Sequence, residues 1–454
     1  MHWINTLYNY VFLTKSTVIV GYYMFLALKG GDKHKAGCKE MKIAIIGSGI
    51  SGLTVAHLLC KDYDVTVFEA NDYIGGHTHT HEIKIDNKSW HIDSGFIVYN
   101  ERTYPNFIKL LNKLKVKTQK TSMGFSVKSP SSGLEYSGGS LNSLFAQRLN
   151  LLKPSFYVMI KDILKFNRIA VSELEGINRT TTINDFLKKH KFGSQFIDNY
   201  IIPMGAAIWS TSASMTTEMP AAFYIRFFKN HGLLQIFNRP QWFVISGGSK
   251  SYIEKIVRGY KENIKLSTPV QKVRRSDKGI EVFYGDHGSA EIFDKVVFAT
   301  HSDQALELLE DPSLEETNIL GSLPYQKNEA VLHTDSRILP KKKITWSSWN
   351  FLNTDKSKPV SLTYNMNILQ SLETEIDFLV TLNGDEQIDP KKIIKRILYH
   401  HPLFTVDGIE AQKKKHQISG VNNTFYCGAY WGNGFHEDGV NSALDVCNSF
   451  NKAL

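Results

Sequence analysis

The stretch MKIAIIGSGISGLTVAHLLCKDYDVTVFEA, from Met41 to Ala70, decides the fold class of this chain. Its apolar run from Ile43 to Ile46 is typical of a buried parallel strand, and a glycine-rich turn then leads into a helix. In a GxGxxG turn the first glycine allows the sharp bend, the second lets the backbone approach a pyrophosphate, and the third lets the helix pack closely on the strand. The stretch therefore predicts a strand, turn and helix that bind a dinucleotide.

A carboxylate completes this unit. A second apolar strand, Val65 to Phe68, ends at Glu69, whose carboxylate is suited to accept hydrogen bonds from the adenosine ribose hydroxyls and would repel a 2′-phosphate. The unpaired N–H groups and positive dipole at the start of the helix suit the pyrophosphate. The unit leaves FAD and NAD both open, and its candidate cofactor-binding residues are Gly47, Ser48, Gly49, Ile50, Ser51, Gly52, Glu69 and Ala70.

Two further turns favour FAD. The segment IGGHTHT follows the strand that ends at Glu69, and DSGFIVYN follows a hairpin expected from Glu82 to Ile92. A reductase with two dinucleotide sites is disfavoured, because the chain carries one complete fingerprint and such reductases need a second. The two turns add the candidate cofactor-binding residues Gly75, Gly76, His77, Gly95, Phe96 and Ile97.

The order of these motifs resembles the superfamily of flavin amine oxidases, phytoene desaturases and protoporphyrinogen oxidases. Longer segments resemble bacterial FAD-binding oxidoreductases associated with cyclopropane fatty-acid synthases, and the N-terminal flavin domain of plant cyclopropane fatty-acid synthases; among them are DSGFIVYNERTYPNF, NHGLLQIFNRPQWF and CGAYWGNGFHEDG. The resemblance runs from about Met41 to the C-terminus. It implies an enzyme with FAD as cofactor and a cyclopropane-synthase-like methyltransferase as a partner.

The closing motif FYCGAYWGNGFHEDGVNSALDV predicts a strand, a glycine-aromatic loop, and a helix from Gly439 to Phe450 that starts beside two acids. In the superfamily that the chain resembles, such a helix points its N-terminus at the C2 carbonyl and N1 of the flavin. A capped terminal helix without a ligand is the alternative. The resemblance implies cofactor contacts at Gly428, Glu437, Asp438 and Gly439 in this motif, and at Val270, Ala299 and Thr300 earlier in the chain.

These motifs together predict an α/β protein. We expect a Rossmann-like FAD-binding domain of the amine oxidase, glutathione reductase-like type, interleaved with an α+β substrate-binding domain. The FAD-binding domain is expected over residues 41–100, 245–302 and 418–454, and the substrate-binding domain over 101–244 and 303–417. Helical patterns are expected from Thr103 to Lys115 and from Ser140 to Leu174.

Catalytic side chains are harder to locate from the sequence. Flavin oxidation needs a substrate C–H held over the ring in a dry cavity, so few titratable groups are required. By their place in the closing motif, His436 and Glu437 are candidates for a proton relay or a substrate contact, and a loop or capping role is the alternative. Lys327 and Asn328 both fit the position of the lysine that many amine oxidases place near the flavin. For Cys427 we expect a packed strand residue, with a covalent flavin bond as the alternative.

The segment from Phe192 to Phe243 is rich in aromatic and aliphatic residues, which suits either a tunnel for an apolar substrate or an ordinary helical core. Four basic residues lie among them and either hold an anionic head group or are surface cations: Arg226, Lys229, His231 and Arg239. The resemblance favours a fatty-acyl lipid as substrate. A flavin amine oxidase and a non-catalytic flavoprotein that supports a lipid methyltransferase are the alternatives.

Composition narrows the class of partner. The 454 residues carry a net charge of +9, much of it in lysine-rich runs at 341–343, 391–396 and 413–415 that are typical of solvated surfaces. No nucleic-acid-binding module accompanies this charge, so contact with an anionic lipid surface is favoured over nucleic-acid binding. The four cysteines show neither zinc-ligand spacing nor a disulfide framework, which predicts no metal site and a reducing, cytoplasmic location with membrane association left open.

Residues 1–40 precede this pattern. Their apolar run from Thr17 to Leu28 is shorter than the roughly twenty residues of a membrane span, and no secretory cleavage site follows it. Met41 stands where proteins of the superfamily commonly begin. We therefore expect residues 1–40 to be a non-structural leader or a misassigned start rather than a membrane anchor.

Overall fold

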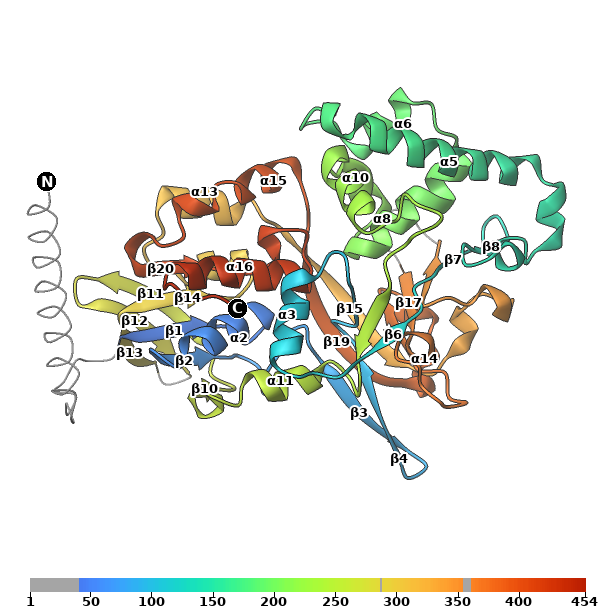
Figure 1. Cartoon of the computed structure of the whole chain (residues 1–454). Helices are drawn as coiled ribbons and strands as arrows, with labels where there is room; N and C mark the ends of the chain where they lie inside the picture. The colour runs from blue at the N-terminus through green and yellow to red at the C-terminus, as the bar shows by residue number, and fades with distance from the viewer. Residues whose placement is uncertain (1–40, 286–287, 354–360) are drawn as a thin grey trace, which may run out of the picture. The chain divides into compact units, whose positions relative to one another are not determined.

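The parallel sheet forms where the opening stretch predicts it (Figure 1). The computed structural model describes residues 41–285, 288–353 and 361–454, so the expectation for residues 1–40 lies outside the described residues. All neighbouring strands of this sheet pair in parallel. Its order is β10 (Ile264–Lys265), β2 (Asp64–Phe68), β1 (Lys42–Ile46), β14 (Lys295–Phe298) and β20 (Thr424–Tyr426). The strands therefore come from all three segments assigned to the FAD-binding domain, although the domain boundaries themselves stay a prediction.

Both faces of this sheet are covered, which explains its continuous apolar strands. Ile43 and Ile45 pack on one face, against α2 (Ile50–Leu59) and α16 (His436–Asn448). Ala44 and Ile46 pack on the other face, which the antiparallel sheet of β11 (Val270–Ser276), β12 (Gly279–Tyr284) and β13 (Ser289–Phe293) covers together with α12 (Ser302–Leu308) and α13 (Leu314–Gly321).

A seven-stranded mixed sheet forms the second part of the fold. Its order is β19 (Ile393–Pro402), β15 (Tyr325–His333), β18 (Leu379–Leu382), β17 (Ser361–Asn365), β16 (Trp349–Leu352), β7 (Phe125–Ser129) and β8 (Leu134–Ser137). Smaller sheets join it to the first: the hairpin β3 (Thr80–Ile85) and β4 (Lys88–Asp93), and the strands β5 (Val98–Asn100), β9 (Trp242–Ile245) and β6 (Thr118–Thr121).

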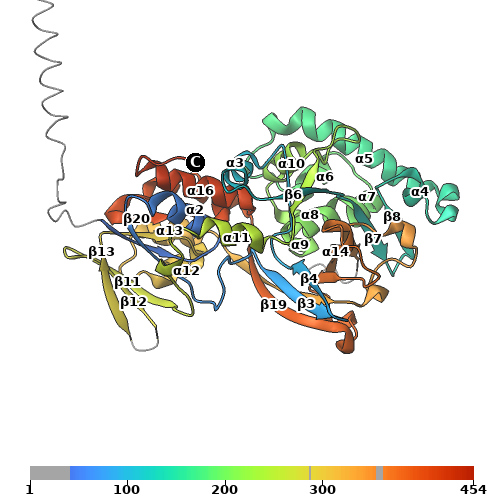
Figure 2. The same cartoon turned by 60° about the horizontal axis from the view of Figure 1, so that its bottom comes forward.

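Helices cap this second sheet (Figure 2). The cap comprises α4 (Leu141–Leu144), α5 (Pro154–Glu173), α6 (Ile183–Lys189), α7 (Ser194–Phe196), α8 (Ile202–Trp209), α9 (Ala213–Glu218) and α10 (Ala221–Asn230). The remaining helices are α3 (Pro105–Lys113), α11 (Lys250–Ile256), α14 (Met366–Leu369) and α15 (Val406–Gln412). None of the helices in the described ranges is long and apolar enough to cross a bilayer.

Two sequence predictions of helices need correction. The closing helix begins at His436 rather than Gly439, because the Asp438 carboxylate accepts a hydrogen bond from the Phe435 N–H and so caps the helix one turn earlier. The same helix ends at Asn448 rather than Phe450. The helix expected from Ser140 to Leu174 is interrupted between α4 and α5. Pro154 explains the break, since proline disfavours a helical residue before it and suits the first turn of α5.

Candidate active site

The glycine turn after β1 is shaped by close backbone approaches. Gly47 has φ +104°, and a Cβ there would lie 2.8 Å from the Ala299 oxygen. A Cβ on Gly52 would overlap the Gly47 carbonyl. Gly49 is different, because nothing lies within 4 Å of the position of its Cβ. The fold thus needs the outer two glycines, whereas Gly49 borders open space where the sequence predicts a pyrophosphate.

Glu69 is fixed at the end of β2. Its buried carboxylate accepts hydrogen bonds from the Ser48 N–H at 2.9 Å and the Ser48 hydroxyl at 2.6 Å. It also accepts from the backbone N–H and side-chain amide of Asn71, at 2.9 and 2.8 Å. A carboxylate offers about four lone-pair sites, so a ribose hydroxyl would take the place of one of these side-chain donors.

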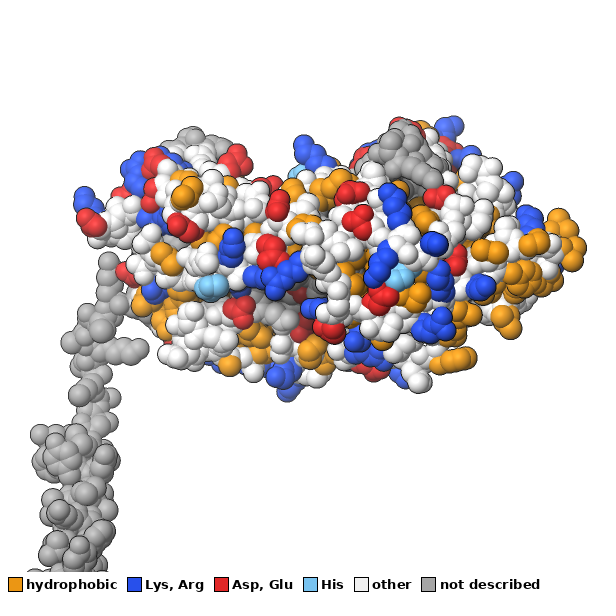
Figure 3. All heavy atoms as spheres, turned by 90° about the horizontal axis from the view of Figure 1, so that it is seen from above, with side chains coloured by type: hydrophobic (Ala, Val, Ile, Leu, Met, Phe, Trp, Pro, Cys, Tyr) orange, Lys and Arg blue, Asp and Glu red, His pale blue; other side chains and the backbone are white. Residues whose placement is uncertain are grey.

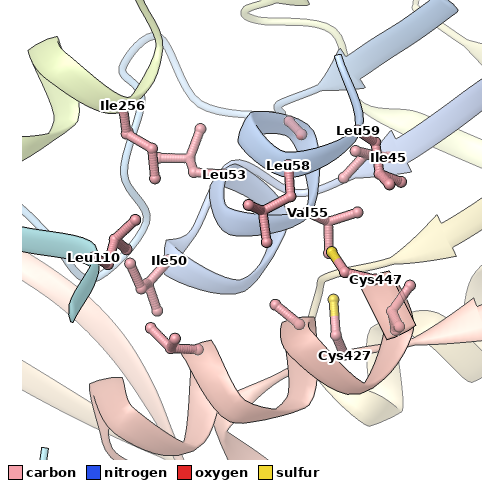
Figure 4. Packing of buried hydrophobic residues seen from close by; sticks show 14 of the residues in the cluster. Ile45, Ile50, Leu53, Val55, Leu58, Leu59, Leu110, Ile256, Cys427 and Cys447 are labelled. Atoms are coloured by element: carbon pink, nitrogen blue, oxygen red, sulfur yellow. The ribbon is translucent and has the colours of Figure 1, made fainter. Parts of the chain in front are cut away.

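The N-termini of α2 and α16 meet directly. The Ser51 hydroxyl donates to the Gly439 carbonyl at 3.0 Å, and a Cβ on Gly439 would lie 2.8 Å from Ile50 Cγ2. Behind this contact the two helices pack through a shared apolar core that includes Val55, Cys427 and Cys447 (Figure 4). The N–H groups of a first helical turn have no partner within the helix, so two positive helix ends face one region.

Cys427 lies inside this core. Its side chain is fully buried, and burial raises the pKa of its thiol to about 12. The thiol is therefore protonated in the folded chain, and its burial agrees with the predicted packing, although Cys427 directly follows β20 rather than lying within it.

The Gly-Gly turn bridges the two helix ends. A Cβ on Gly76 would lie 3.3 Å from Gly49 Cα, and the Thr78 hydroxyl hydrogen-bonds with His436 Nε2 at 3.0 Å. The Asp-x-Gly turn packs on His77, which lies between Gly76 and Thr78, since the Phe96 N–H donates to the His77 carbonyl at 2.7 Å. Predicted cofactor residues from distant parts of the sequence therefore surround one site.

Val270 lies at the edge of this group. It begins β11 two residues after Thr268, whose N–H donates to the Glu69 carbonyl at 2.9 Å. Ile97 instead packs into the core on the seven-stranded sheet.

Both candidate catalytic residues make packing contacts. The Glu437 carboxylate accepts from the N–H groups of Asn106 at 3.0 Å and Phe107 at 2.8 Å, in the first turn of α3. The His436 ring stacks on Phe96 with centroids 3.5 Å apart, and burial lowers the pKa of this imidazole well below its usual value. Their catalytic role stays a prediction, and the contacts favour the capping alternative for Glu437.

His77 carries a polar atom without a partner. Its Nε2 is enclosed and finds no hydrogen-bond partner among the residues that the structure describes. Burial lowers the pKa of His77 to about 4, so the ring is neutral near pH 7. The enclosed nitrogen, the open space beside Gly49 and the N-termini of α2 and α16 together fit a flavin dinucleotide.

His77 belongs to a group of four neutral rings, which we call the floor cluster: His77, His301, Tyr399 and His401. The His77 ring centroid lies 4.9 Å from that of Tyr399, 5.5 Å from that of His401 and 6.0 Å from that of His301. Burial and the neighbouring histidines lower the pKa values of His301 and His401 to about 3. The cluster therefore presents uncharged hydrogen-bonding groups beside the predicted flavin site.

Lys327 and Asn328, the two neighbouring candidates on β15, differ in burial. Lys327 is exposed, whereas Asn328 is fully buried and its amide lies 2.9 Å from His401 Nδ1. The buried residue of this pair is thus Asn328, whose side chain is an amide and not the amine of a lysine. Sequence reasoning missed His401 because it did not predict β19, whose lysine-rich start is exposed at the edge of the sheet.

The cap segment packs largely as a core. Trp209, Tyr224, Phe227 and Phe228 are buried in one apolar cluster of the cap. Three of the four basic residues there are exposed, namely Arg226, Lys229 and Arg239, whereas His231 is buried and stacks on Phe227 with centroids 3.8 Å apart. The exposed cations favour the surface alternative, and an anionic head-group site stays a prediction.

The floor cluster predicts acid sensitivity. The pKa of His77 is about 4 in the folded chain against a usual 6.5, so the unfolded state binds this proton first as pH falls. Stability is thus retained above about pH 6.5 and lost between about pH 6.5 and 4, by about 1.4 kcal/mol per pH unit for one such group. His77→Phe keeps an aromatic ring against Tyr399 but cannot bind this proton. It should therefore reduce the pH dependence of the unfolding free energy between these pH values by about 1.4 kcal/mol per pH unit.

Denaturant unfolding at a series of pH values measures the slope. His91→Phe, at an exposed position, controls for the loss of an imidazole. An unchanged slope in His77→Phe would contradict the neutral, buried state of His77.

The fold and the site define the class: a two-part α/β flavoprotein whose dinucleotide turn and closing helix converge on one cofactor site. The chain belongs to the family of flavin containing amine oxidoreductases, whose family model matches residues 50–449. It is a flavin-dependent oxidoreductase with FAD as its cofactor.

Solved structures share the fold. The CLA-producing fatty acid isomerase from P. acnes superposes with a TM-score of 0.66 at 14% identity, over 91% of this chain and 100% of that one. Cyclohexylamine oxidase from Brevibacterium oxydans IH-35A superposes with a TM-score of 0.65 at 14% identity, over the same shares. Tryptophan 2-monooxygenase of Allorhizobium ampelinum is 52% identical over 48 residues, so the match spans 10% of this chain and 7% of that protein.

In the parts of the chain that the structure describes, no group of three or more His, Cys, Asp or Glu side chains is arranged to hold a metal ion.

Proposed function

We propose that this flavoenzyme oxidises an apolar substrate with a fatty-acyl chain, by desaturation or a related dehydrogenation. FAD, when bound, supplies the acceptor for the hydride that leaves the substrate carbon. The protein's own residues then have to bind the apolar acyl chain of the substrate, exclude water and hold the reacting carbon in place.

One observation carries the proposal: an aromatic wall, whose buried members Trp209 and Phe227 belong to the core of the cap, runs from the cap to the closing helix. Trp209 and Phe227 of the cap lie with ring centroids 4.9 Å apart, and Phe227 lies 5.2 Å from Phe435, the residue directly before α16. Phe223 stacks on Phe404 at 4.8 Å. Phe223 and Phe435 are only partly buried, so an acyl chain that covers them would gain about 0.8 kcal/mol for each buried methylene.

A small pocket adjoins this wall. It lies between α8, α9 and the residues after β19, and it is lined by Trp209, Thr211, Met215, Met219, Pro402, Leu403 and Phe404. At about 10 Å³ the pocket has room for about one water, so its apolar lining extends the apolar surface beside the wall but does not itself hold an acyl chain.

The floor cluster supports an uncharged reacting group. The pKa values of His301 and His401 are lowered by burial and by neighbouring histidines, and no carboxylate contributes to either. An ammonium substrate would bring a charge next to these buried groups without an anionic partner among them, which is costly. An alkyl chain carries no such cost.

A flavin amine oxidase is the second candidate, supported by the family itself and by the shared fold of cyclohexylamine oxidase. The same fold occurs in a fatty acid isomerase, so the fold agrees with both classes of substrate. The sequence resemblance to flavin domains of cyclopropane fatty-acid synthases supports a lipid methyltransferase as partner.

Anaerobic reduction of the bound flavin distinguishes these functions. The purified full chain is mixed without air with oleoyl phospholipid, or with a long-chain primary amine, and the visible flavin absorbance is followed. We expect the acyl lipid to bleach the flavin and the amine to leave it oxidised. Bleaching by the amine alone would favour an amine oxidase. A flavin that only a chemical reductant bleaches would favour a flavoprotein that supports another enzyme.

A further inference from the structure

One corner of the helical cap exposes an unusual concentration of large apolar side chains. Leu141 in α4, and Leu149 and Leu152 in the 3-10 turn Arg148–Leu152, are 77%, 73% and 81% exposed. Leu151 in the same turn, and Tyr157 and Val158 in the first turns of α5, add further exposed apolar surface. Figure 3 shows hydrophobic side chains gathered at this end of the molecule. We call these six residues, all between Leu141 and Val158, the corner patch.

The corner patch is not explained by packing within the fold. The opposite side of α5 already buries Phe156, Met159 and Phe166 in the core of the cap. The start of α5 is therefore apolar on two sides, and its outer side stays about half exposed although Tyr157 lies against Phe145, with ring centroids 6.1 Å apart. Scattered exposed leucines need no explanation, but a contiguous patch on a protruding corner is typical of a binding surface.

The charge around the patch is of one sign. Between Gly138 and Ile160 the sequence contains no acidic residue, while Arg148 and Lys153 flank the leucines. The first acid beyond, Asp162, is buried and accepts a hydrogen bond from the Gly193 N–H at 2.9 Å.

A second segment extends this basic rim. The helix α4 lies beside the 3-10 turn Lys343–Thr345, which brings the exposed run Lys341–Lys343 next to the patch. Ile344 in this turn is itself 47% exposed. Glu135, an acid that contacts this run, is buried, and its carboxylate accepts from the N–H groups of Lys341 and Lys342. The lysine side chains are thus left facing solvent.

We propose that the corner patch docks this protein on a membrane surface that carries anionic lipid. Leucines that enter the headgroup boundary gain free energy from buried apolar area, and each basic side chain near an anionic surface adds attraction that salt weakens. The patch lies at the end of the cap away from the parallel sheet, so docking leaves the dinucleotide turn free (Figure 2). The inference concerns a surface and does not depend on the proposed substrate.

Cosedimentation of the full chain with vesicles tests the proposal. The vesicles contain equal parts of phosphatidylglycerol and phosphatidylcholine, or phosphatidylcholine alone. We expect binding to the mixed vesicles that weakens with added salt, and little binding to phosphatidylcholine alone. The variant Leu149→Ser/Leu152→Ser/Lys153→Glu should bind the mixed vesicles at least tenfold more weakly while it retains its flavin.

A matched control changes the same residue types elsewhere. Leu314→Ser/Val421→Ser/Lys278→Glu alters exposed residues away from the cap and should bind like the unchanged chain. The proposal is overturned if the full chain fails to bind mixed vesicles or if the patch variant binds them as tightly as the unchanged chain. It is also overturned if the patch variant converts a dimer to a monomer in sedimentation without changing vesicle binding, since a second copy would then occupy the patch.

Discussion

A Gly49→Leu variant will fold and will be purified without flavin. Gly49 has φ −68° and ψ 178°, a conformation that leucine adopts readily, and its Cβ would meet no atom within 4 Å. The leucine side chain would instead fill the space that the pyrophosphate needs beside the first turn of α2. We expect affinity for FAD to fall by at least about a thousandfold, or about 4 kcal/mol.

Flavin content after purification and the thermal unfolding midpoint together measure this effect. Gly176→Leu is the matched control, because its Cβ also meets nothing within 4 Å but lies in the cap, and it should keep its flavin. Gly52→Ala is the opposite case, since its Cβ overlaps the Gly47 carbonyl and the fold itself should suffer. A Gly49→Leu protein as yellow as the unchanged chain would remove the glycine turn from the cofactor site.

Glu437→Ala is expected to destabilise the fold rather than to slow the reaction selectively. The buried carboxylate satisfies two N–H groups in the first turn of α3 and also lies at the positive end of that helix. Removal leaves two donors without an acceptor, at about 1–3 kcal/mol each, so the free energy of unfolding should fall by about 2–6 kcal/mol.

Denaturant unfolding measures the loss, and the rate of anaerobic flavin reduction per bound flavin measures any catalytic role. Asp185→Ala is a useful comparison, because Asp185 caps α6 in full contact with solvent and its removal should cost less. If Glu437→Ala left stability unchanged while the reduction rate fell at least tenfold, Glu437 would be a catalytic residue, as its place in the closing motif first indicated.

The unit of β1, the glycine turn, α2 and β2 could be predicted almost completely from sequence. Its apolar residues follow a recognisable local pattern, and the same residues are the ones that the fold buries. The strands β1 and β2, the turn at Gly47 and the position of Glu69 follow from glycine spacing and apolar runs. The closing motif predicts the start of α16 three residues late, because its acids suggest a helix that begins after them, whereas Asp438 caps the helix from within the first turn.

The floor of the site could not be predicted in the same way. Its rings come from three distant segments, and whether Lys327 or Asn328 points inward depends on a strand register that a one-residue shift reverses. The partner of Glu437 in α3 is likewise a tertiary contact between residues more than three hundred positions apart, and no local pattern encodes it.

The cofactor site itself is tested most directly by a crystal structure of the yellow full-length protein. The account predicts FAD with its pyrophosphate beside Gly49 and the first turn of α2, and its ring system beside His77 and the N-terminus of α16. Flavin bound elsewhere in the chain, with the space beside Gly49 filled by protein or solvent, would contradict it.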